Sequence, residues 1–463
     1  MSFRFVDLFS GIGGFHAALT ALGGQCVLAS DIDPDARRVY ADNWNHTPVG
    51  DINDFANDKF VHVPDHEVLV GGFPCQPFSK SGLQKGMDEV RGTLFWNIAK
   101  IIEVKKPKLV LLENVRNLVG PRHLHEWEVI IRTLRELGYR VSDKPLIVSP
   151  HHIHKNFGGR PQIRERVLIA ATRYPDNWSE IKRDINPPDL KWALLAKEFE
   201  WNLREHLPLQ TIDEISELEL NLSKDEKTWI KTWESFVKAI RKDRGTIPGF
   251  PIWLNSWPIG KTKPEERISP SNPEWKNEFI KKNIEFYKKH KDVIDEWYFA
   301  NPQIQDFPPS RKKFEWQAQN ARSIKECILH FRPSGIRVKR STYVPALVAI
   351  TQTTILGDEL RRISVKEAAR LQGFPDWFRF IGQSDAASYK QLGNAVNVGV
   401  IYQVLKAQVA RDFDLLSDNP YIVKNVLTSP DNPDLVLQDP SNVLKHSSNM
   451  PGLQQELPLR IVN

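Results

Sequence analysis

Two kinds of hydrophobic pattern alternate along the first 171 residues of the chain. Short apolar or β-branched runs predict six strands, over 4–8, 25–29, 67–70, 108–112, 145–148 and 166–171. Amphipathic stretches between them predict four helices, over 14–22, 34–43, 94–105 and 123–137. This alternation is typical of a doubly wound, Rossmann-like α/β domain with a parallel sheet, in which ligands bind at the carboxyl ends of the strands.

The pattern changes beyond residue 172. Ten of the fourteen tryptophans fall between 172 and 335, which indicates a second, smaller hydrophobic unit and not a linker. Helix and strand patterns return over 344–351, 365–371 and 389–407, so we predict that the first domain resumes after a long insertion. The expected domains are 1–171, an insertion over 172–335, a completing segment over 336–411, and a C-terminal tail over 412–463. That tail is rich in Asn, Asp, Pro and Ser and is predicted to be extended or weakly ordered.

Composition narrows the protein class. With 463 residues, 41% of them hydrophobic, the chain can form a large core, and it has no apolar run of roughly 18 residues. Asp7 interrupts the apolar part of any signal peptide, so we predict an intracellular protein that does not enter a membrane. The three cysteines, Cys26, Cys75 and Cys327, are far apart and have no Cys/His pairing, so we expect neither disulfides nor a metal site.

Charge adds a weaker indication. The formal net charge is +6, and residues 261–340 hold 18 Lys or Arg against 11 Asp or Glu. A basic segment suits a polyanionic partner. A solvated Lys-rich helix near residues 281–289 explains any single cluster equally well.

A glycine-rich loop follows the first predicted strand. The segment 7–15 contains Gly11, Gly13 and Gly14, which permit a tight turn and close approach of a ligand to backbone N–H groups at a helix start. The second strand ends near Asp31, whose carboxylate can accept hydrogen bonds from ribose hydroxyls or can cap the following helix. Asp51 follows a tight turn and can reach an adenine amino group.

Cys75 lies between Pro74 and Pro77 in the loop after the third strand, outside any apolar run. A thiol there can be a nucleophile if its surroundings favour the thiolate. Glu113 ends the next strand, where it can act in catalysis or cap a helix. Arg164 and Arg166 share one face by the period-two alternation of a strand and suit a phosphate or a base carbonyl, although exposed arginine pairs are common.

These segments, in this order, resemble the cytosine C5 DNA methyltransferase family, of the prokaryotic restriction–modification type. The resemblance covers about 3–171 and 335–407. It rests on the loop 7–14, Pro74-Cys75-Gln76, Glu113-Asn114-Val115, Gln162-x-Arg164-x-Arg166 and the block 391–396, Gln-Leu-Gly-Asn-Ala-Val.

The resemblance implies a reaction and a role for each site residue. The target cytosine is flipped out of the duplex, Cys75 adds to C6, and C5 then takes the methyl group of S-adenosyl-L-methionine (AdoMet). Glu113 would bind the N3/N4 edge of the base, Arg166 its O2, and Arg164 a phosphate and the active-site loop. The base that removes the C5 proton is not identified. The cofactor residues implied by the same resemblance are Phe9, Gly11, Gly13, Asp31, Ile32, Asp51, Pro74, Leu94, Asn394 and Ala395.

The resemblance also implies the partners. The substrate is double-stranded DNA, read by the insertion 172–335, whose tryptophans belong mostly to its core. An RNA cytosine methyltransferase with the same catalytic core is one alternative, and a catalytically inactive AdoMet-binding regulator or DNA-binding scaffold is another. We expect a monomeric enzyme of the bacterial cytoplasm that needs no metal and is paired in function, without a stable complex, with a restriction endonuclease.

Overall fold

The computed structural model describes residues 2–74, 93–176, 185–195, 199–215, 220–243, 245–259, 263–347 and 353–444. The chain divides into two compact units. The first comprises Met1–Glu200, Pro345–Ala349 and Ala368–Asn463, and the second comprises Trp201–Val344 and Ile350–Glu367. Each unit has its own hydrophobic core.

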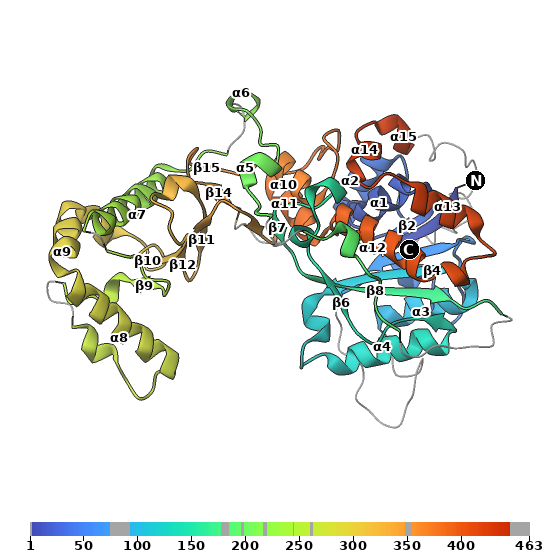
Figure 1. The fold of residues 1–463 in the computed structure, drawn as a ribbon, viewed down its shortest axis with the longest axis horizontal. Coiled ribbons are helices and arrows are strands. Elements are labelled where there is room, and N and C mark those ends of the chain that lie inside the picture. Colours follow the sequence, from blue (N-terminus) through green and yellow to red (C-terminus); the bar gives the residue numbers. More distant parts are fainter. Residues whose placement is uncertain are drawn as a thin grey trace, which may run out of the picture. The chain divides into compact units, whose positions relative to one another are not determined.

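The first unit is built around a seven-stranded sheet with the order β2-β1-β3-β4-β8-β5, in which β6 also pairs with β8 (Figure 1). Its strands are β1 (Phe3–Leu8), β2 (Gly24–Ser30), β3 (Val68–Gly72), β4 (Leu109–Val115), β5 (Tyr139–Arg140), β6 (Leu146–Val148) and β8 (Arg166–Arg173). The helices that flank the sheet are α1 (Gly14–Ala21), α2 (Pro34–Trp44), α3 (Leu94–Lys105), α4 (Leu124–Glu136), α11 (Asp385–Asn394) and α12 (Val398–Arg411). The expected doubly wound α/β fold is confirmed, since α3 and α4 cover one face and α1 and α12 the other (Figure 1).

The direction of one strand departs from the prediction of a parallel sheet. Strands β2, β1, β3 and β4 are parallel, but β8 runs antiparallel to β4, and β5 and β6 run antiparallel to β8. Neighbouring parallel strands are usually joined by a crossover helix, whereas antiparallel neighbours need none. Between β6 and β8 the chain forms only short 3-10 turns and the two-residue strand β7 (Gln162–Ile163), so β8 enters the sheet in the opposite direction.

Local sequence sets the helix boundaries in this unit. Asp33 caps α2 by accepting from the N–H groups of Asp35 and Ala36, and Pro34 occupies the first turn, where no donor is needed. Thr93 caps α3 in the same way. The regular pattern expected over 389–407 corresponds to the end of α11 and most of α12, which are separate helices because Asn397 starts α12 with its own side-chain cap after a break at Ala395.

The C-terminal segment differs from the extended or weakly ordered tail expected after residue 412. As far as Leu444 it forms three helices, α13 (Pro420–Thr428), α14 (Asp434–Leu437) and α15 (Pro440–Leu444), and α13 packs on α12. Ile422, Val426 and Leu437 are buried. The bias toward Asn, Asp and Pro marks the turns between these helices and not a lack of structure.

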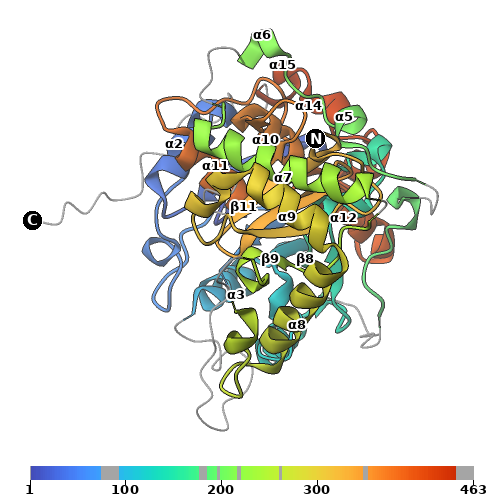
Figure 2. The same cartoon turned by 90° about the vertical axis from the view of Figure 1, so that its left-hand side faces the viewer.

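The second unit is a six-stranded sheet with the order β15-β14-β11-β12-β10-β9 and a helical layer. Its strands are β9 (Ile252–Trp253), β10 (Lys313–Gln317), β11 (Cys327–Arg332), β12 (Gly335–Arg340), β14 (Ile355–Leu356) and β15 (Arg361–Arg362). The longer helices α7 (Lys224–Lys242), α8 (Glu274–Lys289) and α9 (Lys291–Ala300) face the viewer in Figure 2. Short helices α5 (Leu203–His206) and α6 (Ile212–Ile215) precede α7, and α10 (Val365–Gln372) crosses the boundary at Glu367.

The compact units do not end at the expected domain boundaries. Strand β8 continues to Arg173, and Ser142 donates to the carbonyl of Ile185, so the chain beyond residue 171 still packs on the first unit. At the other end, β12 runs from Gly335 to Arg340 within the second unit. Among the described residues, no helix is both long and apolar enough to cross a membrane.

Packing of the C-terminal helices can be tested with two leucines on or near one turn of α14. Leu437 is 1% exposed and Leu435 is 65% exposed. We expect Leu437→Ala to lower the free energy of unfolding by about 2–5 kcal/mol, because it leaves a cavity. Leu435→Ala should change it by less than about 0.5 kcal/mol. Urea unfolding followed by circular dichroism measures both, and equal effects of the two variants would contradict the packing described.

Candidate functional site

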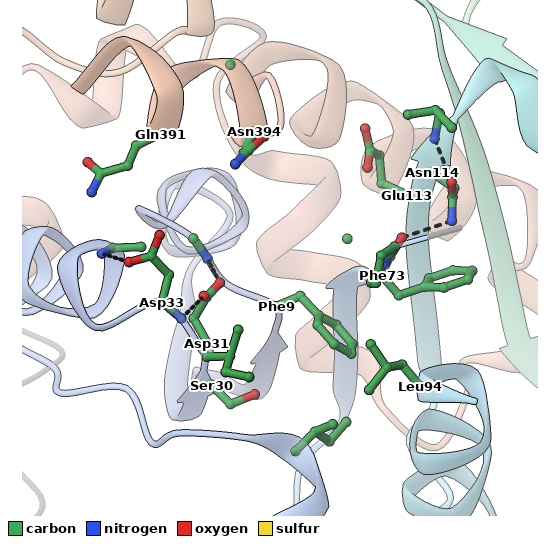
Figure 3. A pocket seen from close by; sticks show the side chains of 18 of the residues that line it. Phe9, Ser30, Asp31, Asp33, Phe73, Leu94, Glu113, Asn114, Gln391 and Asn394 are labelled. Carbon is green, nitrogen blue, oxygen red and sulfur yellow. Dashed lines mark hydrogen bonds between the residues drawn. The ribbon is translucent and has the colours of Figure 1, made fainter. Parts of the chain in front are cut away.

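A cavity of about 470 Å³ opens where four strands of the first unit end (Figure 3). Its size is within the range of small-molecule sites. Most of the residues that line it come from the loops after β1, β2 and β3, from the last residues of β4, from the starts of α3 and β8 and from the end of α11. Of the predicted site residues, those that line it are Phe9, Gly11, Asp31, Ile32, Asp51, Pro74, Leu94, Glu113, Arg164, Arg166 and Asn394.

The glycine-rich loop has the conformation that its sequence requires. Gly11 has φ 53° and Gly13 has φ 90°, both in the left-handed region. A Cβ at Gly13 would lie 2.1 Å from Nε1 of Trp44. Gly13 therefore shapes the loop by letting Trp44 approach, and it does not line the cavity. Phe9, which lines the cavity, also has a positive φ of 54°.

Asp31 is fixed by backbone donors on both sides. Its Oδ2 accepts from the N–H of Gly11 at 2.7 Å and its Oδ1 from the N–H of Asp33 at 2.8 Å (Figure 3). Burial raises the pKa of this carboxyl, while the two N–H groups oppose the rise. The alternative that Asp31 caps the next helix is wrong, since Asp33 does so. Each Asp31 oxygen retains a lone pair for a donor in the cavity.

Two further residues define the same end of the cavity. Ile32 is 72% exposed and adds an apolar surface at the rim. Asp51 caps a short 3-10 helix, and its Oδ1 accepts from the N–H of Asn53 at 2.9 Å and from its Nδ2 at 2.8 Å. Its other oxygen has no hydrogen bond among the described contacts. This end therefore combines carboxylate acceptors with an exposed apolar side chain.

Cys75 lies outside the described residues, but the backbone that leads to it is held. Asn114 donates through Nδ2 to the carbonyl of Phe73 at 2.9 Å, and its Oδ1 accepts from the N–H of Val115 at 2.8 Å. Asn114 was not among the predicted site residues. The signal was present, because it stands beside Glu113 in the Glu-Asn-Val block.

Glu113 and Arg166 form an ion pair on the wall of the cavity. Oε1 of Glu113 lies 2.8 Å from Nε of Arg166, and Nη1 of Arg166 donates to the carbonyl of Glu165 at 3.0 Å. Burial raises the pKa of Glu113, opposed by the charges of Arg166 and Arg164. The helix-cap alternative for Glu113 is wrong, since the following 3-10 helix begins at Arg116 without a side-chain cap. Oε2 of Glu113 and Nη2 of Arg166 have no hydrogen bond among the described residues.

Arg164 is buried, and its two terminal nitrogens donate to main-chain carbonyls, whereas its Nε has no hydrogen-bond partner among the described residues. Its Nη2 donates to the carbonyls of Gly393 at 2.9 Å and Ala395 at 2.7 Å, and its Nη1 to that of Leu347 at 3.3 Å. Burial and, to a smaller extent, the charge of Arg166 lower the pKa of Arg164 to about 9, with the charge of Glu113 acting in the opposite direction. Ala395 does not line the cavity but is held through its carbonyl, which leaves the neighbouring Asn394 at the cavity wall.

The site therefore joins an acceptor-rich end at Asp31 to a charged end at Glu113 in one cavity. Among the residues that the structure describes, no group of three His, Cys, Asp or Glu side chains is arranged to hold a metal ion. A family model described as C-5 cytosine-specific DNA methylase matches residues 3–410. The chain belongs to this family.

Known methyltransferases are similar to this chain over most of its length. The Type II methyltransferase M.AluI of Cellulosimicrobium cellulans is 43% identical over 90% of this chain and 94% of its own length. The Type II methyltransferase M.HhaI of Haemophilus parahaemolyticus is 28% identical over 87% of this chain and 92% of its own. The solved structure of S. pombe Dnmt2 methyltransferase aligns over 88% of this chain and 98% of its own with a TM-score of 0.45 and 17% identity, which adds no argument.

Family membership confirms the expected enzyme class. This methylase is a cytosine C5 DNA methyltransferase, and its family uses AdoMet. The restriction–modification character that we expected is that of its relatives, which are Type II enzymes. The individual roles of the site residues stay predictions.

Proposed function

We propose that this enzyme transfers a methyl group from AdoMet to C5 of a cytosine flipped out of a specific duplex DNA sequence. The proposal rests mainly on one observation: a single cavity holds both the Asp31 end and the Glu113–Arg166 pair. A cosubstrate at one end and a base at the other would then meet inside it. Flipping is required because the base edges that react are inaccessible within the stack.

The Asp31 end suits AdoMet. The free lone pairs of Asp31 suit ribose hydroxyls, and the exposed side chain of Ile32 suits an adenine ring. Asp51 keeps one oxygen for the adenine amino group. Phe9, Gly11, Pro74, Leu94 and Asn394 complete the wall around the methionine portion. Bound there, AdoMet supplies the methyl group.

The Glu113 end suits cytosine. Glu113 has a raised pKa, so its carboxyl can carry a proton for N3 while its oxygens face the N3/N4 edge. Arg166, held by Glu113 through Nε, keeps Nη2 for the O2 of the base. The Cys75 thiolate would add to C6, and the electron pair moved to C5 would form the bond to the methyl group as the methyl–sulfur bond of AdoMet breaks, which leaves S-adenosyl-L-homocysteine. Loss of the C5 proton and elimination of the thiolate from C6 then restore the aromatic ring and free Cys75.

We assign Arg164 a supporting role. Its Nη2 is already occupied by the carbonyls on both sides of Asn394, so a phosphate contact through this nitrogen would have to replace these bonds. The bonds instead hold the end of α11 against the start of β8. This positions the cofactor wall relative to Arg166.

The biological role that we propose follows the Type II relatives. The enzyme would methylate one DNA sequence in the bacterial cytoplasm, acting as a monomer, and so protect host DNA from a cognate restriction endonuclease without a stable complex. Loss of the methyltransferase should then be lethal in cells that keep the endonuclease. Bisulfite sequencing of DNA from expressing cells identifies the sequence that is methylated.

The covalent step is tested by trapping. Duplex DNA that carries 5-fluorocytosine should form an adduct stable in SDS, because fluorine at C5 cannot leave as a proton. Cys75→Ser should give no adduct, and Cys26→Ser, which changes a thiol beside Tyr40, should give as much as the wild type. An adduct with Cys75→Ser would refute the assignment of Cys75 as the nucleophile. Faster methylation of transfer RNA than of duplex DNA would refute the assignment of DNA as the substrate.

The role of Glu113 is tested by Glu113→Gln. We expect kcat to fall by about 10²–10⁴-fold, because the variant cannot deliver a proton to N3. Glu165→Gln is the matched control, since Glu165 pairs with Arg116 next to the site. Single-turnover rates at several pH values measure both. The wild-type rate should fall as pH rises through the raised pKa of Glu113, and this limb should be missing from the variant. Equal rates for Glu113→Gln and the wild type would contradict the assignment.

AdoMet binding is tested without DNA. Asp31→Ala should weaken AdoMet binding by roughly tenfold or more, because it removes charge-assisted hydrogen bonds. Asp35→Ala removes an exposed carboxylate on α2 that pairs with Arg38, and should leave affinity unchanged. Isothermal titration calorimetry gives both constants. Unaltered affinity in Asp31→Ala would place the ribose elsewhere.

A further inference from the structure

One face of the sheet in the second unit carries a cluster of charged side chains. On β10 and β12 alternate residues are buried in the core, namely Phe314, Trp316, Ile336 and Val338. The ring of Trp233 on α7 stacks on that of Phe314 with 4.6 Å between the ring centroids, so α7 covers this side of the sheet. The residues between them point to the opposite side because side chains alternate along a strand. We call this side the β10–β12 face; its charged residues are Lys313, Glu315, Arg337 and Lys339.

Three of these four charged residues are cations, and they are close enough to affect one another. Burial lowers the pKa of Lys339, and the positive charge of Arg337 lowers it further, while Glu315 opposes the fall. Crowded cations with one anion leave an excess of positive potential at the face. That excess favours a partner that presents anionic groups or hydrogen-bond acceptors.

Arg337 is held at the centre of the face. In the sheet register it lies between Glu315 of β10 and His330 of β11. Its Nε donates to Oε2 of Glu315 at 2.8 Å, and its side chain is 31% exposed. Nη1 and Nη2 make no hydrogen bond among the described residues. The guanidinium is therefore fixed through one edge while the edge formed by Nη1 and Nη2 stays free.

A fixed guanidinium with two parallel donors matches one base in particular. Guanine presents O6 and N7 as neighbouring acceptors in the major groove, and arginine binds them through two hydrogen bonds. Phosphate binding does not need a braced fork, and the flexible side chains of Lys313 and Lys339 can supply it. A carboxylate that orients an arginine also reduces the number of side-chain rotamers that the arginine loses when it binds DNA, which lowers the entropic cost of binding.

We infer that Arg337 reads a guanine of the target sequence in the major groove and that Glu315 is its positioning residue. The inference rests on the proposed function, since the partner is the duplex whose cytosine is methylated. Lys313 and Lys339 contact the flanking phosphates. Substitution of Arg337 therefore alters which sequences are methylated, beyond any change in how tightly DNA is bound.

The test is methylation of a duplex library with randomised sequence, read by bisulfite sequencing. The wild type should methylate cytosine in one context. Arg337→Ala and Arg337→Lys should relax the requirement at one G·C pair of that context by roughly tenfold or more, because a good bidentate contact discriminates by that amount. Glu315→Gln should relax the same position to a smaller extent.

The matched control is Lys238→Ala. Lys238 is 63% exposed on α7, on the other side of the sheet, and its substitution by alanine removes the same unit of positive charge. Its sequence context should equal that of the wild type. Unchanged context in both Arg337 variants, or relaxation at an A·T pair only, would overturn the inference. Absence of cytosine methylation by the wild-type enzyme would instead refute the proposed function.

A DNA-binding measurement tests the inference even where an Arg337 variant folds but does not methylate DNA. Replacing the recognised guanine by 7-deazaguanine removes the N7 acceptor alone. Binding of the wild type to this duplex should weaken by about fivefold or more, whereas Arg337→Ala should bind both duplexes equally. Wild-type affinity that is insensitive to 7-deazaguanine at every guanine of the site would overturn the inference.

Discussion

The buried guanidinium of Arg164 holds together the two separate parts of the first unit at the site. It donates to the carbonyls of Gly393 and Ala395, residues more than two hundred positions along the chain. A buried cation costs free energy unless it is well paired, and these carbonyls, at the break between α11 and α12, need donors. The same bonds therefore pair Nη2 of the guanidinium with both carbonyls. They also place Asn394 in the wall of the cavity that ends at Glu113.

The directions of the strands bring the other site residues together. The parallel strands β1 to β4 bring their carboxyl ends to one edge, which gathers the loops that carry Phe9, Asp31 and Pro74 beside Glu113 near the end of β4. Arg166 begins β8, and it meets Glu113 only because β8 is antiparallel to β4. In a parallel β8 the first residue would lie at the opposite edge, about 20 Å away at 3.3 Å per residue. The one antiparallel reversal is thus a requirement of the Glu113–Arg166 ion pair.

The second unit follows a different design. The hydrophobic residues of β10 and β12 pack against α7 on one side of the sheet. The alternate positions of these strands face the other side and carry charged side chains. Most of its tryptophans, Trp233, Trp257, Trp297 and Trp316 among them, belong to the core, as their large apolar surfaces favour. A rigid apolar layer beneath a polar face is a suitable support for side chains that must hold a fixed geometry.

The sequence by itself determined the order of the elements, the family and the kinds of side chain at the site. Glycines at positive φ, helix caps and motif blocks are properties of neighbouring residues, so they can be read locally, as with Gly11, Thr93 and Glu113. Only the tertiary structure decided that Asn114 holds the backbone before Cys75 and that Arg164 is bonded to carbonyls. It also decided the direction of β8 and the helical packing of 420–444. These depend on hydrogen bonds and buried surface shared by residues far apart in the chain, which no local pattern encodes.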